Sequence, residues 1–431
     1  MEFKRLSVLP GVHINVLPTA KFKTIRIKLF WRWPLAEESV TKTALLPMVM
    51  KRGCAPWPTN RDIAIRLESL YGAGFGMDVT KIGETQNIEF DLEVADDSYI
   101  GSTERRVDLL KQGLEFLHAV TMQPLLPQGA FREEYVTGEK AILRRKIEAL
   151  INDKPRYALT RLLENMCRHE PFSLYRYGRV ADLDAITPER LGAHYYRLIE
   201  QAVMEFYIVG GVEPERAVSL VADLWRLPKR EPLSFPAAGR QPAGETRLVR
   251  EEQDVKQAVL AIGLRQATTY TSDDYPALLV QNGILGGYPH SKLFINVREK
   301  HSMAYFAYSR LDTTKGLQFL LAGIDAARFQ EALDLITAQL EETKAGKISQ
   351  EELEAAQKSI TNDFLSSRDD AGQIIDADYL GQVNNKPRRI EETLVRVNQV
   401  TVEDVMRVAA GATLDTIYFL SDQSRKDGIT K

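Results

Sequence analysis

The sequence predicts an α+β protein of two similar domains in tandem, each an antiparallel-rich sheet packed with helices on one face. Three observations lead to this fold class: an approximate internal repeat, strand-like segments grouped with helical ones in the same order, and a Pro- and Gly-rich segment between the two halves. A chain of 431 residues has room for about two domains of ordinary size.

The repeat appears when the sequence is shifted by 233 positions, so that residues 23–53 lie on residues 256–286. Each segment begins with strand-like alternation, continues through polar residues typical of a helix start, and becomes an apolar helix that ends at a Gly. The identical pairs are Lys23 and Lys256, Arg32 and Arg265, Ala44 and Ala277, Leu45 and Leu278, Leu46 and Leu279, and Gly53 and Gly286.

The order of elements after the repeat is also the same in the two halves. Alternating strands come next, and the following helices are expected at 105–120 and 131–150 in the first half, and at 327–343 and 349–367 in the second. Each half then closes with a helix and a strand. We therefore predict a first domain at 1–226, a linker at 227–246 and a second domain at 247–431.

Thr187 and Thr401 are expected to be equivalent N-caps of the closing helices, because acids that suit a positive helix end follow both.

Composition excludes several classes of protein. The content of 44% hydrophobic and 27% charged residues is that of a soluble globular protein. A net charge of −3 with both signs interspersed gives no reason to expect nucleic acid or a membrane as partner. No apolar run approaches 18 residues and no signal peptide is apparent, so we expect a cytoplasmic protein. Cys54 and Cys167 are expected to be reduced core residues.

The most specific local string is ILGGYPHSKLFINVREKHSMAY, residues 284–305. Its Gly pair permits a tight turn, Ser291 begins a helix, and Arg298 lies near the end of that helix. Tyr305 lies on the following strand. A guanidinium and a phenol in these positions can hold a peptide through hydrogen bonds. The alternative is that Arg298 caps helix carbonyls and that Tyr305 belongs to the core.

This string resembles the second-half signature of the pitrilysin/insulinase-type peptidases. The matching features are the Gly-Gly turn, Ser-x-Leu-Phe, Arg-Glu-Lys, and Ala-Tyr ending seven residues after the Arg. The resemblance implies the two-domain fold of that family. It also implies that Arg298 and Tyr305 bind the substrate backbone and the tetrahedral intermediate over a zinc ion.

The first half lacks the residues that bind this zinc. The family carries His-x-x-Glu-His on a helix, where two His bind the metal and the Glu activates its water. The corresponding positions hold Thr43, Leu46 and Pro47, and the later ligand position, seven residues after Glu139, holds Lys146. None of the four can replace the original residue. We therefore expect no catalytic residue, no metal and no cofactor.

A metal site built from other residues has little support in the sequence. No two of the six His residues are three or four positions apart, and Cys167 and His169 have no nearby ligand in the sequence.

The resemblance implies a non-catalytic homologue that pairs with a zinc-bearing homologue and helps bind a peptide or protein substrate in a shared chamber. Self-association is the alternative to a heterodimer. In overall character the chain is similar to the zinc-less, bacterial YmfF-like group, which implies a link to an elongation factor P modification pathway. Two other functions stay open: an active zinc peptidase with a rearranged metal site, and a structural scaffold subunit.

Overall fold

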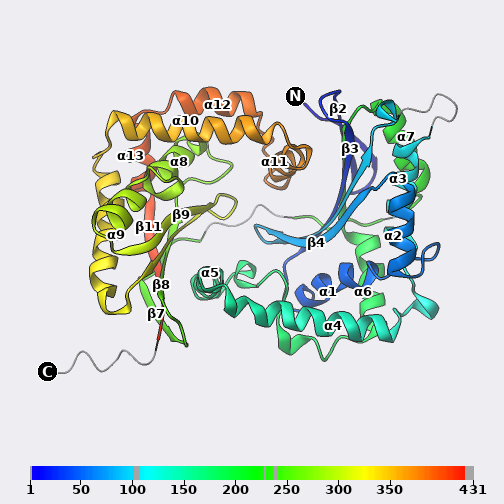
Figure 1. The fold of residues 1–431 in the computed structure, drawn as a ribbon, viewed down its shortest axis with the longest axis horizontal. Coiled ribbons are helices and arrows are strands. Elements are labelled where there is room, and N and C mark those ends of the chain that lie inside the picture. The colour runs from blue at the N-terminus through cyan, green and yellow to red at the C-terminus, as the bar shows by residue number, and fades with distance from the viewer. Residues whose placement is uncertain (1, 101–106, 228–229, 236–240, 423–431) are drawn as a thin grey trace. The chain divides into compact units, whose positions relative to one another are not determined.

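The structure is a computed structural model that describes residues 2–100, 107–227, 230–235 and 241–422. Its contacts divide the chain into two compact units (Figure 1). Unit 1 comprises Met1–Glu148, Leu174–Phe235 and Asp370–Ala377, and unit 2 comprises Ala149–Ser173, Pro236–Asp369 and Asp378–Lys431.

The units therefore interleave along the sequence, and residues 149–173 from the first half pack in unit 2. The boundaries predicted at 1–226 and 247–431 divide the chain into homologous halves, whereas the two units divide it by contacts. The boundaries of the halves therefore remain a prediction. Within the expected linker at 227–246, residues 228–229 and 236–240 lie outside the described residues.

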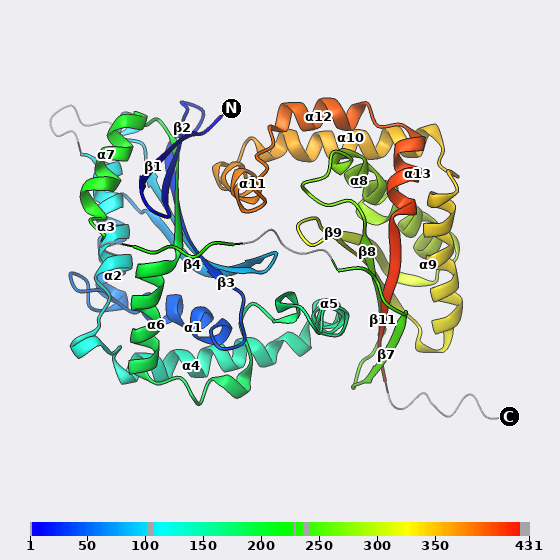
Figure 2. The same cartoon turned by 180° about the vertical axis from the view of Figure 1, so that it is seen from behind.

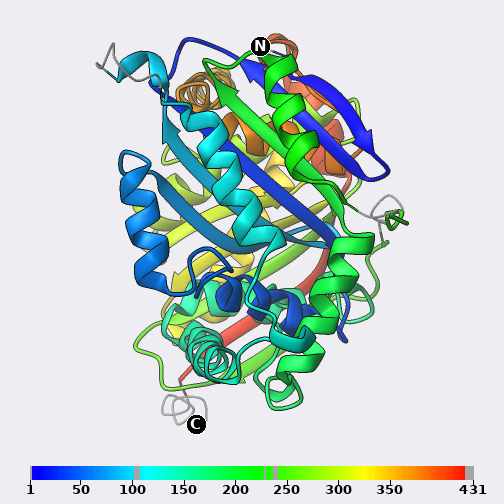
Figure 3. The same ribbon diagram turned by 90° about the vertical axis from the view of Figure 1, so that its right-hand side faces the viewer.

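Unit 1 contains a six-stranded sheet in the order β1-β2-β6-β3-β5-β4. Its strands are β1 (Lys4–Leu9), β2 (Val12–Pro18), β3 (Thr24–Pro34), β4 (Gly74–Ile82), β5 (Thr85–Ala95) and β6 (Val203–Gly210). Its helices are α1 (Val40–Met50), α2 (Asn60–Ser69), α3 (Leu109–Met122), α4 (Glu133–Glu148), α6 (Pro188–Gln201) and α7 (Pro214–Leu224). Figure 3 looks onto the helical face of this unit, where α3 (cyan) and α7 (green) lie over the strands.

The alternation in β3 explains why one face of this sheet carries the core. Ile27, Leu29 and Trp31 are buried against the helices. Lys28 lies on the other face, and its Nζ is 2.6 Å from Glu89 of β5 and 2.7 Å from Asp376. A two-residue period places apolar and charged side chains on opposite faces of a strand.

Unit 2 contains a five-stranded sheet in the order β7-β11-β8-β10-β9. Its strands are β7 (Arg247–Glu252), β8 (Ala258–Gln266), β9 (Ala304–Asp312), β10 (Leu317–Ile324) and β11 (Ala412–Ser421). Its helices are α5 (Lys154–Met166), α8 (Tyr275–Asn282), α9 (Phe329–Lys344), α10 (Gln350–Ser367), α12 (Ile390–Asn398) and α13 (Val402–Ala410), while α11 (Ala371–Val383) has residues in both units.

This second sheet is covered on both faces, contrary to the sequence prediction of one. Helix α9 packs on the face formed by Leu260 and Ile262. Helix α5 packs on the opposite face through Leu162 and Met166 (Figure 1, Figure 2). Every residue of β8 is consequently buried. The sequence prediction fails here because α5 comes from a distant part of the chain.

The two sheets share one strand order. In the second, β7-β11-β8-β10-β9 matches β2-β6-β3-β5-β4 of the first, with one parallel pair at the start and antiparallel pairs after it. The predicted fold class is therefore confirmed. The N-caps predicted at Thr187 and Thr401 are also confirmed, since each side chain accepts a hydrogen bond from the backbone N–H three residues on.

Two further observations concern the general class of protein. Cys54 and Cys167 are both buried and neither forms a disulfide, as predicted. Among the described residues, none of the helices has the length and apolar character required to cross a bilayer.

Candidate functional site

In unit 1, the positions that correspond to the zinc motif lie on α1. Thr43, Leu46 and Pro47 are all buried. Pro47 lies inside the helix, where its ring nitrogen cannot donate the hydrogen bond that the Thr43 carbonyl would accept. The helix tolerates this loss in a well-packed core.

The Thr43 hydroxyl makes a hydrogen bond of 2.8 Å with Nε2 of His194 on α6. Burial, together with the charges of Lys42 and Arg197, lowers the pKa of His194 to about 3. The imidazole is therefore neutral near pH 7. Sequence reasoning did not associate His194 with this position, because the two residues are 151 positions apart.

Helix α4 carries the last position of the aligned zinc set. Glu139 is buried and forms an ion pair with Arg52. Two turns further on, Nζ of Lys146 lies 3.5 Å from Oδ1 of Asp78 and 3.9 Å from the centre of the Tyr177 ring. The Tyr177 hydroxyl donates to the same carboxylate at 3.0 Å. Lys146 thus belongs to a local charge cluster.

These residues do not fit a zinc ion. Leu46 and Pro47 offer no donor atom, the Thr43 hydroxyl is already bonded to His194, and Lys146 is a cation. The described part of the chain also contains no group of three or more His, Cys, Asp or Glu residues placed to hold a metal. We therefore assign no chemical step to a metal in this unit.

In unit 2, the string at 284–305 forms a turn and a wide helix. The chain continues from α8 into two π-helical segments, η6 (Gly283–Gly287) and η7 (Leu293–Lys300). Gly286 is required by close packing, because a Cβ atom there would lie 2.5 Å from the backbone N of Ser309 on β9. The predicted helix is present and starts near Ser291, with π-helical geometry that sequence periodicity does not distinguish.

A buried hydrogen-bond network supports this turn. The Gln318 side chain on β10 donates to Ser309 Oγ at 3.0 Å and to Asn282 Oδ1 at 3.2 Å. Ser309 Oγ in turn donates to Asn282 Oδ1 at 2.7 Å. Buried networks of this kind hold a local structure in one arrangement when their members are satisfied.

Arg298 and Tyr305 lie on adjoining elements of this region. Arg298 is on η7, with 42% of its side chain exposed and its guanidinium 4.5 Å from the centre of the Phe294 ring. Tyr305 is on β9 and is 75% exposed. The backbone N–H of Met303 donates to the Val297 carbonyl at 2.9 Å, which ties the end of η7 to the start of β9.

The alternative reading of this pair disagrees with the burial of Tyr305. A tyrosine that is 75% exposed is not a core residue. Arg298 pairs weakly with its neighbour Glu299 at 3.6 Å, and its side chain is 42% exposed. Both side chains can therefore make hydrogen bonds with another molecule.

Comparisons with known proteins agree with this architecture. A family profile described as "Peptidase M16 inactive domain" matches residues 185–360. The chain is 35% identical over 410 residues to the "Probable inactive metalloprotease YmfF" of Bacillus subtilis, covering 95% of this chain and 96% of the relative. The chain belongs to the peptidase M16 family, the pitrilysin/insulinase-type peptidases.

Solved structures give the same result for the fold. A conserved protein from Enterococcus faecalis matches with a TM-score of 0.91 and 30% identity, covering 99% of this chain and 100% of that protein. A peptidase M16 inactive domain from Pseudomonas fluorescens matches with a TM-score of 0.79 at 17% identity, covering 98% and 99%. The family profile and the YmfF relative together identify an inactive-type homologue of the peptidase M16 family.

Proposed function

We propose that the chain is a non-catalytic subunit that pairs with a zinc-bearing homologue and binds a peptide substrate through Arg298 and Tyr305. The observation that carries the proposal is the contrast between two sets of positions. The zinc positions hold groups that cannot bind metal and are already packed or paired. The peptide-binding positions keep an Arg and a Tyr that are exposed.

The chemistry of the two side chains suits a polypeptide backbone. A guanidinium offers several N–H donors in a planar fork, which matches a carbonyl or carboxylate oxygen. The Tyr305 phenol adds one more donor on the neighbouring strand. In a shared chamber the partner would supply the zinc and its water, and this chain would orient the substrate.

The first experiment asks whether such a partner exists. We expect co-expression and affinity purification with a zinc-bearing homologue of similar length to give a stable pair with peptidase activity. If the purification recovers only further copies of this chain, self-association replaces the heterodimer. Stoichiometric zinc bound by the purified single chain, with chelator-sensitive hydrolysis, would instead establish an active peptidase with a rearranged metal site.

The second experiment tests the two residues in the reconstituted pair. Loss of a hydrogen bond from a charged group costs about 1.5–3 kcal/mol, so Arg298→Ala should lower kcat/KM roughly 10- to 150-fold. Tyr305→Phe, which removes one neutral donor, should lower it about 2- to 10-fold. Arg310→Ala is the matched control, because Arg310 is an exposed arginine on the same strand.

An unchanged kcat/KM in the Arg298 and Tyr305 variants, with pairing intact, would refute substrate binding and favour a scaffold role. Loss of pairing in either variant would likewise count against substrate binding by Arg298 and Tyr305 and favour a scaffold role.

We also propose, on the similarity to the YmfF-like relative, that the pair acts in an elongation factor P modification pathway. The test is mass spectrometry of elongation factor P from cells that lack this chain. An unchanged modification pattern would remove the pathway and leave the pairing proposal standing.

A further inference from the structure

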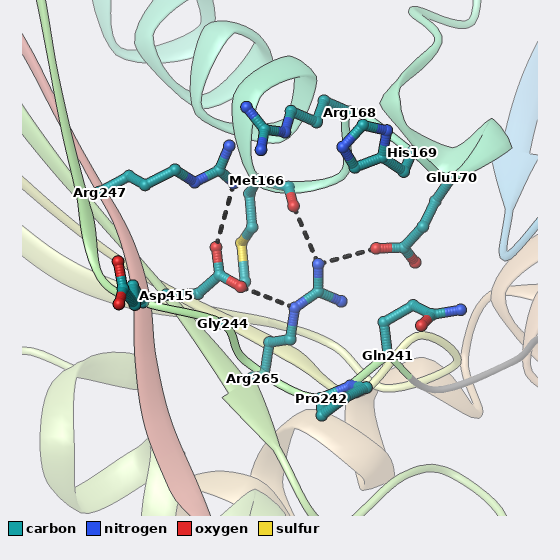
Figure 4. Close-up of a pocket in the computed structure, with 11 residues that line it drawn as sticks. Met166, Arg168, His169, Glu170, Gln241, Pro242, Gly244, Arg247, Arg265 and Asp415 are labelled. Atoms are coloured by element: carbon teal, nitrogen blue, oxygen red, sulfur yellow. Dashed lines mark hydrogen bonds and ion pairs between the residues drawn. The ribbon is translucent and has the colours of Figure 1, made fainter.

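Unit 2 contains a pocket of about 550 Å³, well away from the string at 284–305 in the sequence (Figure 4). It is lined by the residues that follow α5, by the segment that leads into β7, and by side chains from β8 and β11. We call it the Arg265 pocket, after the arginine at its base. Its volume lies in the range of small-molecule sites in proteins.

Arg265 is held firmly in place and is only 5% exposed. Its Nε donates to Asp415 Oδ2 at 2.8 Å, and its Nη2 donates to Glu170 Oε1 at 2.7 Å and to the Met166 carbonyl at 2.9 Å. Its Nη1 makes no hydrogen bond with any described residue. In Figure 4 this nitrogen carries no dashed line and points to the side of the pocket where Gln241 lies.

The two buried acids are already neutralised by other groups. Glu170 also forms an ion pair with Lys315, whose Nζ lies 2.8 Å from Glu170 Oε2. Asp415 lies 3.7 Å from Nη2 of Arg247 and accepts a hydrogen bond from Thr416. The lining also includes Arg168 and Glu245. Counted together with these two, the charged groups in and beside the pocket carry a net charge of +1: four cations (Arg168, Arg247, Arg265 and Lys315) against three acids (Glu170, Glu245 and Asp415).

The mouth of the pocket adds two further donors. Arg168 and His169 are exposed and lie on the turn after α5. Neither side chain enters an ion pair or hydrogen bond within the part of the chain that the structure describes. Both are therefore free to bind a ligand, and His169 can do so in either protonation state.

We propose that the Arg265 pocket binds the oxyanion group of a small ligand, a carboxylate or a phosphate, through Arg265 Nη1, with Arg168 and His169 closing over it. Nη1 carries two N–H groups that bond to no described residue, and the donors of a largely buried guanidinium need an acceptor in the pocket. Water alone can satisfy them, but a prearranged donor with excess positive charge favours an anion over water. The site is independent of the proposed pairing, since all its residues belong to unit 2.

The binding test uses the full chain and isothermal titration calorimetry. Inorganic phosphate is one probe. The second is a tetrapeptide with a free C-terminal carboxylate, compared with the same peptide as its C-terminal amide. Saturable binding of phosphate, or of the free peptide but not the amide, is the expected result. Comparison of the two probes shows whether the ligand group is a phosphate or a carboxylate.

The variants show whether the ligand occupies this pocket. Arg168→Ala combined with His169→Ala removes exposed groups without partners, so the fold should be unaffected and binding should weaken at least tenfold. Arg61→Ala is the matched control, because Arg61 is an exposed arginine on α2 in unit 1. Arg265→Lys should also abolish binding, but the conclusion does not depend on it, since that variant can fail to fold.

Two results would overturn the proposal. One is the absence of saturable binding of either probe up to about 10 mM, where affinities become too weak to be specific. The other is binding that the Arg168 and His169 changes leave within twofold of the unaltered chain.

Discussion

Replacing Lys315 by Met should destabilise unit 2 strongly, because it leaves a buried carboxylate with half of its partners. The Lys315 side chain is 0% exposed and Glu170 is 5% exposed, with Nζ and Oε2 at 2.8 Å. At an effective dielectric constant of ~20, two unit charges at this distance attract by about 6 kcal/mol. Desolvation offsets part of this energy, and removing one partner of a buried pair typically costs about 3–5 kcal/mol.

Hydrogen exchange is the suitable assay, because a protein with two units need not unfold in one step. All four tryptophans, at 31, 33, 57 and 225, lie in unit 1, so their fluorescence does not report unit 2. Peptides that cover β8 and β10 should exchange roughly 150- to 5000-fold faster in Lys315→Met, the equivalent of about 3–5 kcal/mol.

Lys347→Met is the control for this change. The Lys347 side chain is 69% exposed and lies 3.6 Å from Glu342, so its loss should change exchange by threefold or less. If hydrogen exchange of β8 and β10 in Lys315→Met is accelerated by less than tenfold, the argument that this ion pair is shielded from water is wrong.

The pH dependence gives an independent check on the same pair. Burial alone would raise the pKa of Glu170, but Lys315 and Arg265 outweigh it and lower that pKa below the usual 4.5. The stabilisation by ionised Glu170 is therefore fully present above pH 4.5 and is lost as the pH falls through the lower folded-state value. As the pH falls below 4.5, the difference in the stability of unit 2 between the wild type and Lys315→Met should therefore decrease.

Two other predictions concern stability. The folded pKa of His194 is about 3 against an ordinary 6.5, so the unfolded chain binds the extra proton and the free energy of unfolding should fall as the pH drops from 6.5 towards 3. NMR should find the His194 imidazole neutral at pH 5, and His194→Gln should remove this part of the pH dependence; titration near pH 6.5 would contradict the burial argument. Gly286→Ala should destabilise unit 2 by roughly 1–3 kcal/mol, because the new Cβ meets the Ser309 backbone. Gly76→Ala, where nothing lies within 4 Å of the added atom, should be far milder, and equal exchange protection of β9 in both variants would disprove the packing argument.

Local patterns in the sequence were sufficient for the fold class and several elements. The helix expected at 349–367 is α10 (Gln350–Ser367), and the one expected at 131–150 is α4 (Glu133–Glu148). Both have strong polar starts and apolar positions at helical spacing. The two halves also have the same order of elements along the chain, as the repeat suggested.

Long-range contacts could not be predicted in the same way. The Thr43 and His194 pair joins residues 151 positions apart, and the Arg265 and Glu170 pair joins residues 95 positions apart. Neither pair has a spacing that marks it in the sequence. The Cys167–His169 stretch, which had little support in the sequence as a metal site, lies at the end of a helix that packs on a remote sheet. Its polar neighbours become visible only once α5 is placed on that sheet.

The position of α5 has a consequence for biosynthesis. Met166 ends this helix, whereas β11, one of the strands on which it packs, ends at Ser421, about 250 residues later. At a synthesis rate of roughly 5–20 residues per second, the apolar side of α5 waits roughly 13–50 s for the completed sheet. During this interval the nascent chain exposes a surface that only its own last strand completes. A ribosome that stalls before β11 would therefore release a chain in which unit 1 has all its strands while α5 still lacks part of the surface that buries it.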